Sequence, residues 1–476
     1  MSLVLYNTLN GGKEQFKPLE EGRVKLYVCG PTVYDESHIG HARSAIVFDV
    51  LVRHLLDLGY QVTYVRNFTD IDDKIINRAR EAGVDCRDLA EKYIRSYHED
   101  LDALGALRPD FEPRATEFID RMLDDVQALM HKGVAYLVGG DVYYEVARFP
   151  EYGRLSGRNI EEMQAGARVD VDERKKSPMD FALWKESKDH EPSWPTPWGI
   201  PGRPGWHIEC SAMSNCLLGQ VFDIHGGGHD LIFPHHENEM AQSMALGRPF
   251  ARYWVHNGFV RVDHQKMSKS LKNFFTIKEV LRNFKPEVLR LFLLSKHYRG
   301  PIDFSDEGLR ETQRGLDRAY RALEGAGELG ATPAPAPGPE TREIRDLFRD
   351  AMNDDLNTSK ALGHLFEAVK EVNRLLDEAR AGRTDPAALG SWLAAVRGMS
   401  RTLGILEQDP NQWFTEAVRE DEADLTPDKI EALIQARTEA RKARNWAEAD
   451  RIRDELKAAG VVLEDAGGQT RWRLEA

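Results

Sequence analysis

Cysteine is scarce in this sequence, with four residues among 476, at Cys29, Cys86, Cys210 and Cys216. So few and so widely spaced thiols provide no disulfide framework, which excludes the small disulfide-stabilised class and predicts reduced thiols. No apolar run is long enough to cross a bilayer, and residues 1–7 lack a basic region followed by an apolar stretch. We therefore expect a cytoplasmic protein with no membrane partner.

Two common phosphate-binding loops are also missing. There is no Gly-x-x-x-x-Gly-Lys-Ser/Thr run and no Gly-x-Gly-x-x-Gly after a predicted strand, which excludes the P-loop and dinucleotide-binding classes. The run His225-Gly226-Gly227-Gly228 is similar to an esterase oxyanion loop, but no Gly-x-Ser-x-Gly elbow accompanies it. An esterase is therefore excluded as well.

An excess of positive charge is absent too, since the net charge is −14. This balance argues against a protein that coats nucleic acid indiscriminately, although a local basic face could still bind RNA phosphates. The length of 476 residues predicts two to four domains.

What is present begins with a strand–helix–strand pattern. Residues 24–29 predict a strand, residues 42–58 a helix that ends at Gly59, and residues 61–67 a second strand. Such a βαβ unit predicts a parallel sheet with ligands at its carboxyl edge. After a segment with a different residue pattern, apolar strands are again predicted at 221–224 and 254–262.

The fold class that we predict is α/β. Residues 1–110 and 205–304 form the two halves of a Rossmann-like parallel-sheet domain, and residues 111–204 are an insertion between them. A helical bundle at 305–406, interrupted by an extended Pro/Ala loop, and a linker at 407–425 follow. The chain ends in a small mixed α/β domain, 426–476, with a helix pair and a short strand.

A first chemical signal lies between the first strand and its helix, in the run His38-Ile39-Gly40-His41. A helix amino terminus offers free N–H groups and a positive dipole end, which suits a triphosphate. Two histidines three positions apart face the same way on a helix, and Gly40 lets a flat group approach the backbone. The alternative is a pair of capping or surface histidines.

The second signal is the run Lys266-Met267-Ser268-Lys269-Ser270, a cationic segment that could neutralise charge on a leaving pyrophosphate. Alone, it could be a solvated basic turn. The pairing of the two runs in one chain resembles the class I aminoacyl-tRNA synthetases. The resemblance implies that His38, His41, Lys266 and Lys269 act in catalysis, and that Gly40 and Ser268 join them in binding ATP with magnesium.

A metal site is predicted from scattered thiols, imidazoles and carboxylates. If Pro234 opens a helix, His235 and Glu239 share one face of it, and with Cys29 and Cys210 they make a plausible zinc shell. Spacing alone leaves rivals open, because the two cysteines could be buried small hydrophobes. The rival ligands are His207, His225, His229 and His236.

The strings around Cys29, at 205–213 and at 225–239 resemble those of cysteinyl-tRNA synthetases. This resemblance implies one zinc per chain, held by Cys29, Cys210, His235 and Glu239, and an amino-acid pocket lined by Gly30, Thr69 and Trp206. Zinc that captures a thiolate would reject serine, which an apolar pocket separates poorly from cysteine. The implied substrates are L-cysteine, ATP and tRNA-Cys, and the implied state is a monomer. We interpret Asp72 as a helix cap rather than a magnesium ligand.

Six basic and three acidic residues lie between Arg437 and Arg453, beside Trp446. Such a helix could bind phosphates and stack an unpaired base, or it could be a solvated helix with internal ion pairs. The segment resembles the family's anticodon-binding module, and the helices of 305–406 resemble its stem-contacting bundle. The residues that we expect to contact tRNA are Arg437, Arg441, Lys442, Arg444 and Trp446. Two positions depart from the family's pattern, Lys272 and Phe118.

Three alternative functions are to be compared with that of a cysteinyl-tRNA synthetase. A ligase that passes activated cysteine to an amino sugar would share the metal and phosphate residues, but would not need residues 426–476. A non-catalytic RNA-binding relative is disfavoured by the intact His38, His41, Lys266 and Lys269. A zinc hydrolase is disfavoured because four protein ligands leave little room for an activated water.

Overall fold

The chain folds around a four-stranded parallel sheet, as a computed structural model shows for residues 2–159, 174–262, 265–266, 275–415, 427–458, 461–466 and 469–474. The strand order is β10-β9-β3-β4. The strands are β3 (Arg23–Val28), β4 (Gln61–Arg66), β9 (Val221–Gly228) and β10 (Phe250–Asn257). The predicted βαβ unit and parallel sheet are therefore confirmed.

Helix α1 (Ile39–Asp57) connects β3 to β4 and is apolar on most of its surface, so it is buried within the larger of the two main cores. It begins three residues before the predicted start at residue 42. Helices α2 (Asp73–Ala82) and α3 (Cys86–Ala103) follow. Asp72 caps α2 by accepting from the Lys74 N–H, which confirms its interpretation as a cap.

The second half of the sheet is followed by smaller elements. The strand predicted at 254–262 is broken at Gly258, whose N–H bonds to the Tyr298 carbonyl oxygen instead of continuing a ladder. A second sheet of order β12-β11-β13 results. Its strands are β11 (Val260–Val262), β12 (Gln265–Lys266) and β13 (Ile302–Phe304), and helices α8 (Ile277–Leu281) and α9 (Pro286–Leu294) lie between the last two.

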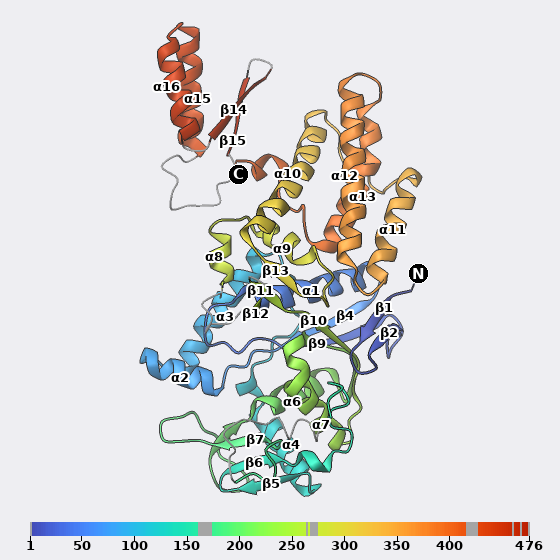
Figure 1. The fold of residues 1–476 in the computed structure, drawn as a ribbon, viewed down its shortest axis with the longest axis vertical. Helices are drawn as coiled ribbons and strands as arrows, with labels where there is room; N and C mark the ends of the chain where they lie inside the picture. Colours follow the sequence, from blue (N-terminus) through green and yellow to red (C-terminus); the bar gives the residue numbers. More distant parts are fainter. Residues whose placement is uncertain are drawn as a thin grey trace.

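An antiparallel sheet, β5-β6-β7-β8, forms the lower end of the molecule in Figure 1, with α4 (Ile119–His131) against it. Its strands are β5 (Ala135–Val138), β6 (Asp141–Tyr144), β7 (Phe181–Glu186) and β8 (Gly202–Pro204). Helices α6 (Trp206–Leu218) and α7 (Glu237–Ala245) connect this part to the central sheet, and together they enclose the second core.

The upper part of the molecule is helical (Figure 1). Its elements are α10 (Asp306–Glu328), α11 (Arg342–Asn353), α12 (Thr358–Arg380), α13 (Leu389–Leu403) and α14 (Pro410–Trp413). Residues 331–338 contain no helix or strand, as the Pro/Ala composition predicts. None of the helices described is both long enough and apolar enough to span a bilayer.

Two short hairpins complete the fold. The amino-terminal hairpin pairs β1 (Val4–Asn7) with β2 (Gly12–Gln15), and the carboxyl-terminal hairpin pairs β14 (Val461–Ala466) with β15 (Gln469–Leu474). The latter packs with α15 (Pro427–Lys442) and α16 (Trp446–Ala458) around a separate small core. The sequence predicted β14 but missed β15, whose residues are mostly polar.

Candidate functional site

The four parallel strands end at one edge of the sheet, and the candidate site lies there. Cys29 follows β3, Asn67 follows β4, Gly228 ends β9 and Asn257 ends β10. A cavity of about 350 Å³ opens at this edge. Among the residues predicted to act on substrates, those that line it are Cys29, Gly30, His38, Gly40, His41 and Trp206.

The two histidines of the first motif stand together at the start of α1. His38 is the N-cap residue, and its Nδ1 accepts hydrogen bonds from the N–H groups of Gly40 (3.0 Å) and His41 (3.3 Å). The rings of His38 and His41 stack, with centroids 3.7 Å apart. The capping alternative is confirmed for His38, and the cap fixes both rings at the cavity wall. The phosphate-binding role of the two histidines stays a prediction.

The chain that follows the second motif is tied to the same helix start. Thr276 bridges to His38, the Ile39 N–H donates to the Phe275 carbonyl (3.1 Å), and the Ile277 N–H donates to the Ser37 carbonyl (2.9 Å). The backbone of Lys266 lies in β12. The side chain of Lys266, together with Ser268, Lys269 and Lys272, lies outside the described residues.

The four predicted metal ligands meet in one buried cluster. The Sγ atoms of Cys29 and Cys210 lie 3.6 Å apart, and Cys29 Sγ lies 3.5 Å from Glu239 Oε1. His235 Nε2 lies 3.0 Å from the same carboxylate oxygen. One donor atom from each of Cys29, Cys210, His235 and Glu239 lies within 4.8 Å of the others, and we call this set the four-donor cluster.

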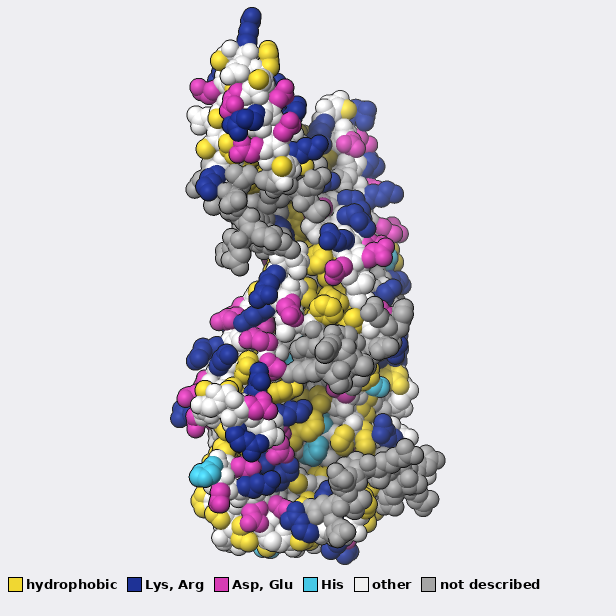
Figure 2. Space-filling model, turned by 60° about the vertical axis from the view of Figure 1, so that its left-hand side comes forward, with side chains coloured by type: hydrophobic (Ala, Val, Ile, Leu, Met, Phe, Trp, Pro, Cys, Tyr) yellow, Lys and Arg dark blue, Asp and Glu magenta, His cyan; other side chains and the backbone are white. Residues whose placement is uncertain are grey.

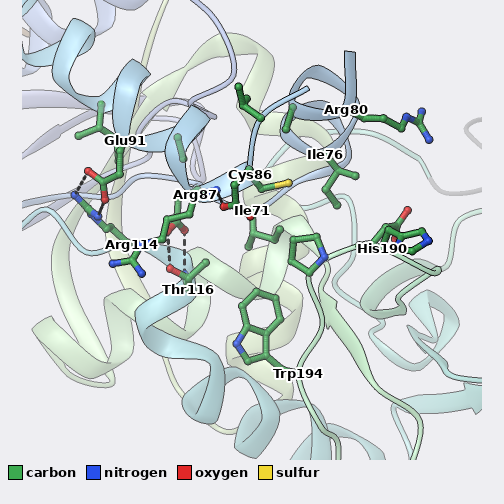
Figure 3. A pocket seen from close by; sticks show the side chains of 18 of the residues that line it. Ile71, Ile76, Arg80, Cys86, Arg87, Glu91, Arg114, Thr116, His190 and Trp194 are labelled. Atoms are coloured by element: carbon green, nitrogen blue, oxygen red, sulfur yellow. Dashed lines mark hydrogen bonds and ion pairs between the residues drawn. The ribbon is translucent and has the colours of Figure 1, made fainter. Parts of the chain in front are cut away.

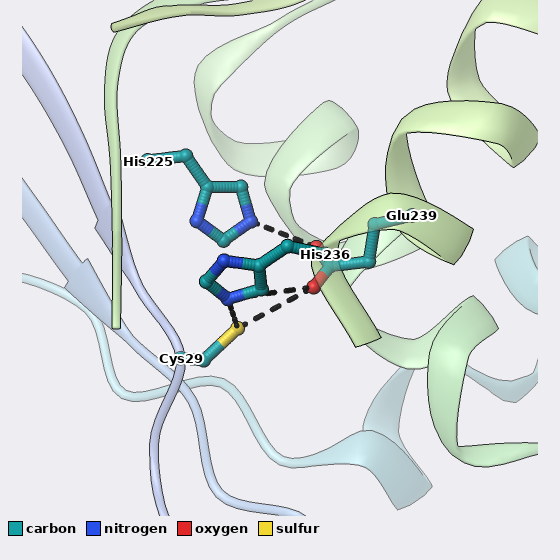
Figure 4. Close-up of side chains that lie close together, drawn as sticks. All are labelled: Cys29, His225, His236 and Glu239. Atoms are coloured by element: carbon teal, nitrogen blue, oxygen red, sulfur yellow. Dashed lines mark hydrogen bonds and ion pairs between the residues drawn. The ribbon is translucent and has the colours of Figure 1, made fainter. Parts of the chain in front are cut away.

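A second set of donors, drawn in Figure 4, shares Cys29 and Glu239 with the first. His225 Nε2 lies 2.8 Å from Glu239 Oε2, and His236 Nε2 lies 3.3 Å from Cys29 Sγ. The donor atoms of this second set therefore also lie close enough together to hold one metal ion; its residues are Cys29, His225, His236 and Glu239. Two of the four rival histidines thus lie in the site. Of the others, His207 contacts His235, with their Nδ1 atoms 3.0 Å apart, and His229 is exposed.

Burial and mutual charge set the protonation of the four-donor cluster. Burial opposes ionisation of Cys210, but hydrogen bonds from Cys29 and His235 outweigh it and lower its pKa to about 6. Burial and the neighbouring Cys210 raise the pKa of Cys29 well above its ordinary value. Burial disfavours a charged His235, but Glu239 and Cys210 raise its pKa to about 10. The negatively charged donors therefore surround a positive charge, which the protonated imidazole of His235 supplies in this structure.

These residues fit a zinc ion. Two sulfurs, an imidazole and a carboxylate make a donor set that zinc accepts, and thiolates distinguish it from the oxygen-preferring calcium and magnesium. Among the described residues, His225 Nδ1 is buried beside the cluster without a hydrogen-bond partner, and the buried Tyr27 hydroxyl contacts Cys210. Polar groups therefore converge here beyond what the fold alone satisfies.

The predicted amino-acid pocket residues occupy different places. Gly30 lies so close to β4 that a Cβ atom would come 1.6 Å from the Asn67 carbonyl oxygen, so only glycine fits. Trp206 stacks on His235, with ring centroids 4.2 Å apart, and lines the cavity. Thr69 is buried and donates to Glu209 Oε2 (2.6 Å), and it is not among the residues that line the cavity.

With this geometry in place, comparison with known proteins is informative. Residues 15–314 match the family described as tRNA synthetases class I (C) catalytic domain. Residues 347–407 match the DALR domain, and residues 423–473 match the cysteinyl-tRNA ligase anticodon binding domain. The chain is 52% identical to the cysteine–tRNA ligase of Syntrophobacter fumaroxidans and 53% identical to that of Geobacter sulfurreducens, with 100% of both chains covered in each case. The chain belongs to the cysteine–tRNA ligase family.

As a member of this family the chain is a class I aminoacyl-tRNA synthetase, and the resemblance stated from the motifs is confirmed. Its fold also resembles the Mycobacterium tuberculosis methionyl-tRNA synthetase in complex with methionyl-adenylate. The TM-score is 0.58 and the identity 16%, and the match covers 80% of this chain and 88% of that one. This second likeness concerns the fold alone.

In this cysteine–tRNA ligase family member, sequence reasoning missed several residues that line the cavity. Arg66 ends β4, Ser44 lies one turn into α1, and Asn257 ends β10. The positions of Arg66 and Asn257 at strand ends could have indicated both residues, because the carboxyl ends of parallel strands lie at the ligand-binding edge of a sheet. Gly228, in the run first compared with an esterase loop, lines the cavity for the same reason.

A second cavity, of about 970 Å³, lies between α2, α3 and residues 188–194 (Figure 3). Cys86 lines it, half-buried, in a wall that combines aliphatic side chains and Trp194 with many charged residues. On its rim Arg114 pairs with Glu91, and Thr116 donates to Asp70. No residue predicted to act on a substrate lies in this cavity.

The predicted tRNA-contacting residues are not equivalent. Trp446 is 60% exposed, and Arg441, Lys442 and Arg444 are exposed too. Arg437 is only 8% exposed and its Nη1 lies 3.4 Å from Thr470 Oγ1, so it is the least accessible of the five predicted tRNA contacts. Figure 2 shows Lys and Arg mixed with Asp and Glu over this upper domain rather than gathered in one patch.

Proposed function

We propose that this protein activates L-cysteine with ATP and transfers it to the 3′-terminal adenosine of tRNA-Cys. The observation that carries the proposal is the position of the four-donor cluster: Cys29 belongs to it and also lines the cavity that the stacked His38 and His41 border. A metal-binding thiol site and a helix-start phosphate site therefore share one opening.

We propose that the four-donor cluster holds zinc. When bound, zinc supplies a soft Lewis acid that prefers a substrate thiolate to the hydroxyl of serine, because a thiol loses its proton far more readily. Trp206 stacks on His235 and also lines the cavity, so it lies beside the cluster on the cavity side. Selection at this site replaces proofreading, since one-atom differences give a plain pocket little discrimination.

In the first step the carboxylate oxygen of cysteine attacks the α-phosphorus of ATP in line. The bond from that phosphorus to the bridging oxygen breaks, and pyrophosphate leaves with magnesium. No protein nucleophile takes part, so positioning and charge neutralisation supply the rate. We assign these tasks to His38, His41 and Gly40 at the start of α1, with Lys266, Ser268 and Lys269.

In the second step a ribose hydroxyl of the terminal adenosine attacks the carbonyl carbon of cysteinyl-adenylate. AMP leaves as the ester forms, and the hydroxyl proton passes to an acceptor in the site. We propose that residues 305–406 contact the tRNA stem, and that Arg441, Lys442, Arg444 and Trp446 contact the anticodon region. The match of residues 423–473 to an anticodon-binding domain supports a tRNA rather than an amino-sugar acceptor.

We propose that a monomer acts in the cytoplasm, where the four free cysteines stay reduced. The test of the whole proposal is ATP–pyrophosphate exchange with cysteine or serine, followed by transfer to tRNA and metal analysis of the protein. Expected results are exchange with cysteine alone, esterified tRNA, and stoichiometric zinc. Exchange without transfer would support the amino-sugar ligase, and active protein free of zinc would refute the metal assignment.

A further inference from the structure

The cavity at the sheet edge contains a buried cation that neither motif predicted. Arg66 is the last residue of β4 and is 4% exposed, and it lines the cavity together with His41, Ser44 and Tyr97. Its backbone N–H donates to the Phe111 carbonyl (3.0 Å), so the residue is fixed at the strand end.

The guanidinium of Arg66 has no anionic partner in the part of the chain that the structure describes. A guanidinium carries five N–H donors. Among the described residues the side chain forms one hydrogen bond, from Nη2 to Ser44 Oγ (3.0 Å), while Nε is buried without an acceptor. No carboxylate among the described residues forms an ion pair with Arg66. A buried charge with so few partners costs folding free energy unless a ligand completes its contacts.

Three other buried arginines of the chain have structural roles, and their contacts can be compared with those of Arg66. Arg43 donates to three backbone carbonyls, Arg290 pairs with Asp49 and donates to three carbonyls, and Arg203 pairs with Asp73. Each of these three side chains joins elements that are distant in the sequence. Arg66 does not, since Ser44 is a neutral hydroxyl on the helix that already packs on β4.

We propose that Arg66 binds a phosphate group of a substrate in the cavity, with the Ser44 hydroxyl orienting the guanidinium. The planar fork of arginine suits two phosphate oxygens, and the amino terminus of α1, where His41 lies one turn before Ser44, favours the same charge. This inference rests on the proposed function, which supplies two substrates that carry phosphate. The phosphate that Arg66 binds belongs either to ATP or to the phosphodiester next to the terminal adenosine of tRNA.

The experiment compares Arg66→Met and Arg66→Lys with wild type and with Arg108→Gln. Arg108 is an exposed arginine nearby that pairs with Asp102, so it serves as the matched control. Binding of ATP and of intact tRNA is measured directly by calorimetry and filter binding. Pyrophosphate exchange and single-turnover transfer from preformed adenylate are measured in parallel, and thermal unfolding monitors folding.

Loss of a charge-assisted contact should weaken binding of the affected ligand by about 10- to 100-fold in Arg66→Met, and less in Arg66→Lys. An effect on ATP binding and exchange identifies ATP as the source. Normal exchange with slow transfer identifies the tRNA phosphodiester. If Arg66→Met does not fold, the test uses Arg66→Lys, which keeps the charge but not the planar fork. Its binding of ATP and of tRNA is then compared with that of wild type.

The proposal is overturned if the folded variant binds both ligands and reacts within about twofold of Arg108→Gln. Its failure is distinct from failure of the proposed function. A wild-type protein that binds ATP and tRNA but shows no cysteine-dependent exchange would refute the proposed function, while the binding comparison would still test Arg66.

Discussion

The sulfur atoms of Cys29 and Cys210 lie 3.6 Å apart although 181 positions separate the two residues. One follows the first strand of the central sheet and the other lies in α6, after the insertion. A buried pair of thiols at this distance, with an imidazole and a carboxylate beside it, is what the proposed zinc site requires.

Replacement of either thiol should therefore release the metal. For Cys210→Ser we expect zinc content to fall at least about tenfold and kcat/KM for cysteine to fall more than about 100-fold, because a hydroxyl is a poor zinc ligand. Metal analysis and pyrophosphate exchange measure the two effects. Cys216→Ser, at an exposed cysteine, is the control and should retain both. Full zinc in Cys210→Ser would show that another set of donors holds the ion.

The two tasks of His38 can be separated. His38→Ala removes both the helix cap and the ring, so we expect a stability loss of about 1 kcal/mol and a fall in exchange of about 100-fold. His38→Asn restores a capping oxygen and should recover stability without recovering exchange. Urea unfolding and exchange kinetics test this. Recovery of exchange in His38→Asn would mean that the ring serves only the cap.

Gly30 should tolerate no side chain. In Gly30→Ala the Cβ would meet the Asn67 carbonyl oxygen at 1.6 Å, so β3 and β4 must separate at the cavity. We expect a loss of about 2 kcal/mol or more in the free energy of unfolding, measured with denaturant. In Gly12→Ala no atom lies within 4 Å of the new Cβ, so this control should be neutral or slightly stabilising.

Asp100 should make stability depend on pH. Its carboxyl is buried with Oδ2 unpaired, and burial raises its pKa to about 7, with Lys278 opposing the shift and Glu36 and Glu99 adding to it. Below about pH 4 the carboxyl is protonated in both the folded and unfolded states. Between pH 4 and 7 the folded state holds more protons, so stability falls as pH rises.

Asp100→Asn removes this dependence. At pH 8 we expect the variant to be about 1 kcal/mol more stable than wild type, less than the full shift implies because water screens the site. The difference should shrink toward pH 4. Unfolding curves at several pH values measure it, with Asp102→Asn, an exposed position on α3, as control. A difference that stays constant with pH contradicts the assignment to Asp100.

The carboxyl-terminal domain should respond to salt in a residue-specific way. Arg441→Gln and Lys442→Gln should each lower the slope of log affinity for tRNA against log salt by about 0.7 to 0.9 if each contacts one phosphate. Pyrophosphate exchange, which needs no tRNA, should not change. Arg437→Met should instead lower the stability of the domain, since Arg437 packs against β15. Equal salt slopes in all variants would remove this helix from the tRNA interface.

The burial of Arg437 was predictable from the sequence. Ile430, Ile434 and Arg437 are spaced i, i+4 and i+7, so they share one face of α15, and all three are at most 8% exposed. The expectation of a tRNA contact at Arg437 rested on the charge composition of the segment alone. A buried arginine in a small domain is consistent with a long side chain whose head finds a polar partner, here Thr470.

Other features lay beyond sequence reasoning. The strands at 24–29 and 61–67 were predictable because apolar runs and Gly59 marked their limits. The choice between His235 and His236 was not, because the turn η4 (Ile232–His236) directs both imidazoles toward Glu239. Arg66 could be placed at the sheet edge by its position. That Ser44 is its one side-chain partner among the described residues depends on the packing of α1, which no local pattern encodes.

The strand order β10-β9-β3-β4 has a consequence for how the protein is made on the ribosome. Strand β3 pairs with β4 early, but its other neighbour, β9, begins at Val221, 155 residues after β4 ends at Arg66. At translation rates of about 5 to 20 residues per second, that edge stays uncovered for about 8 to 30 s. The inserted domain can fold during this interval, and only afterwards can the nascent chain bring its two distant sulfurs together.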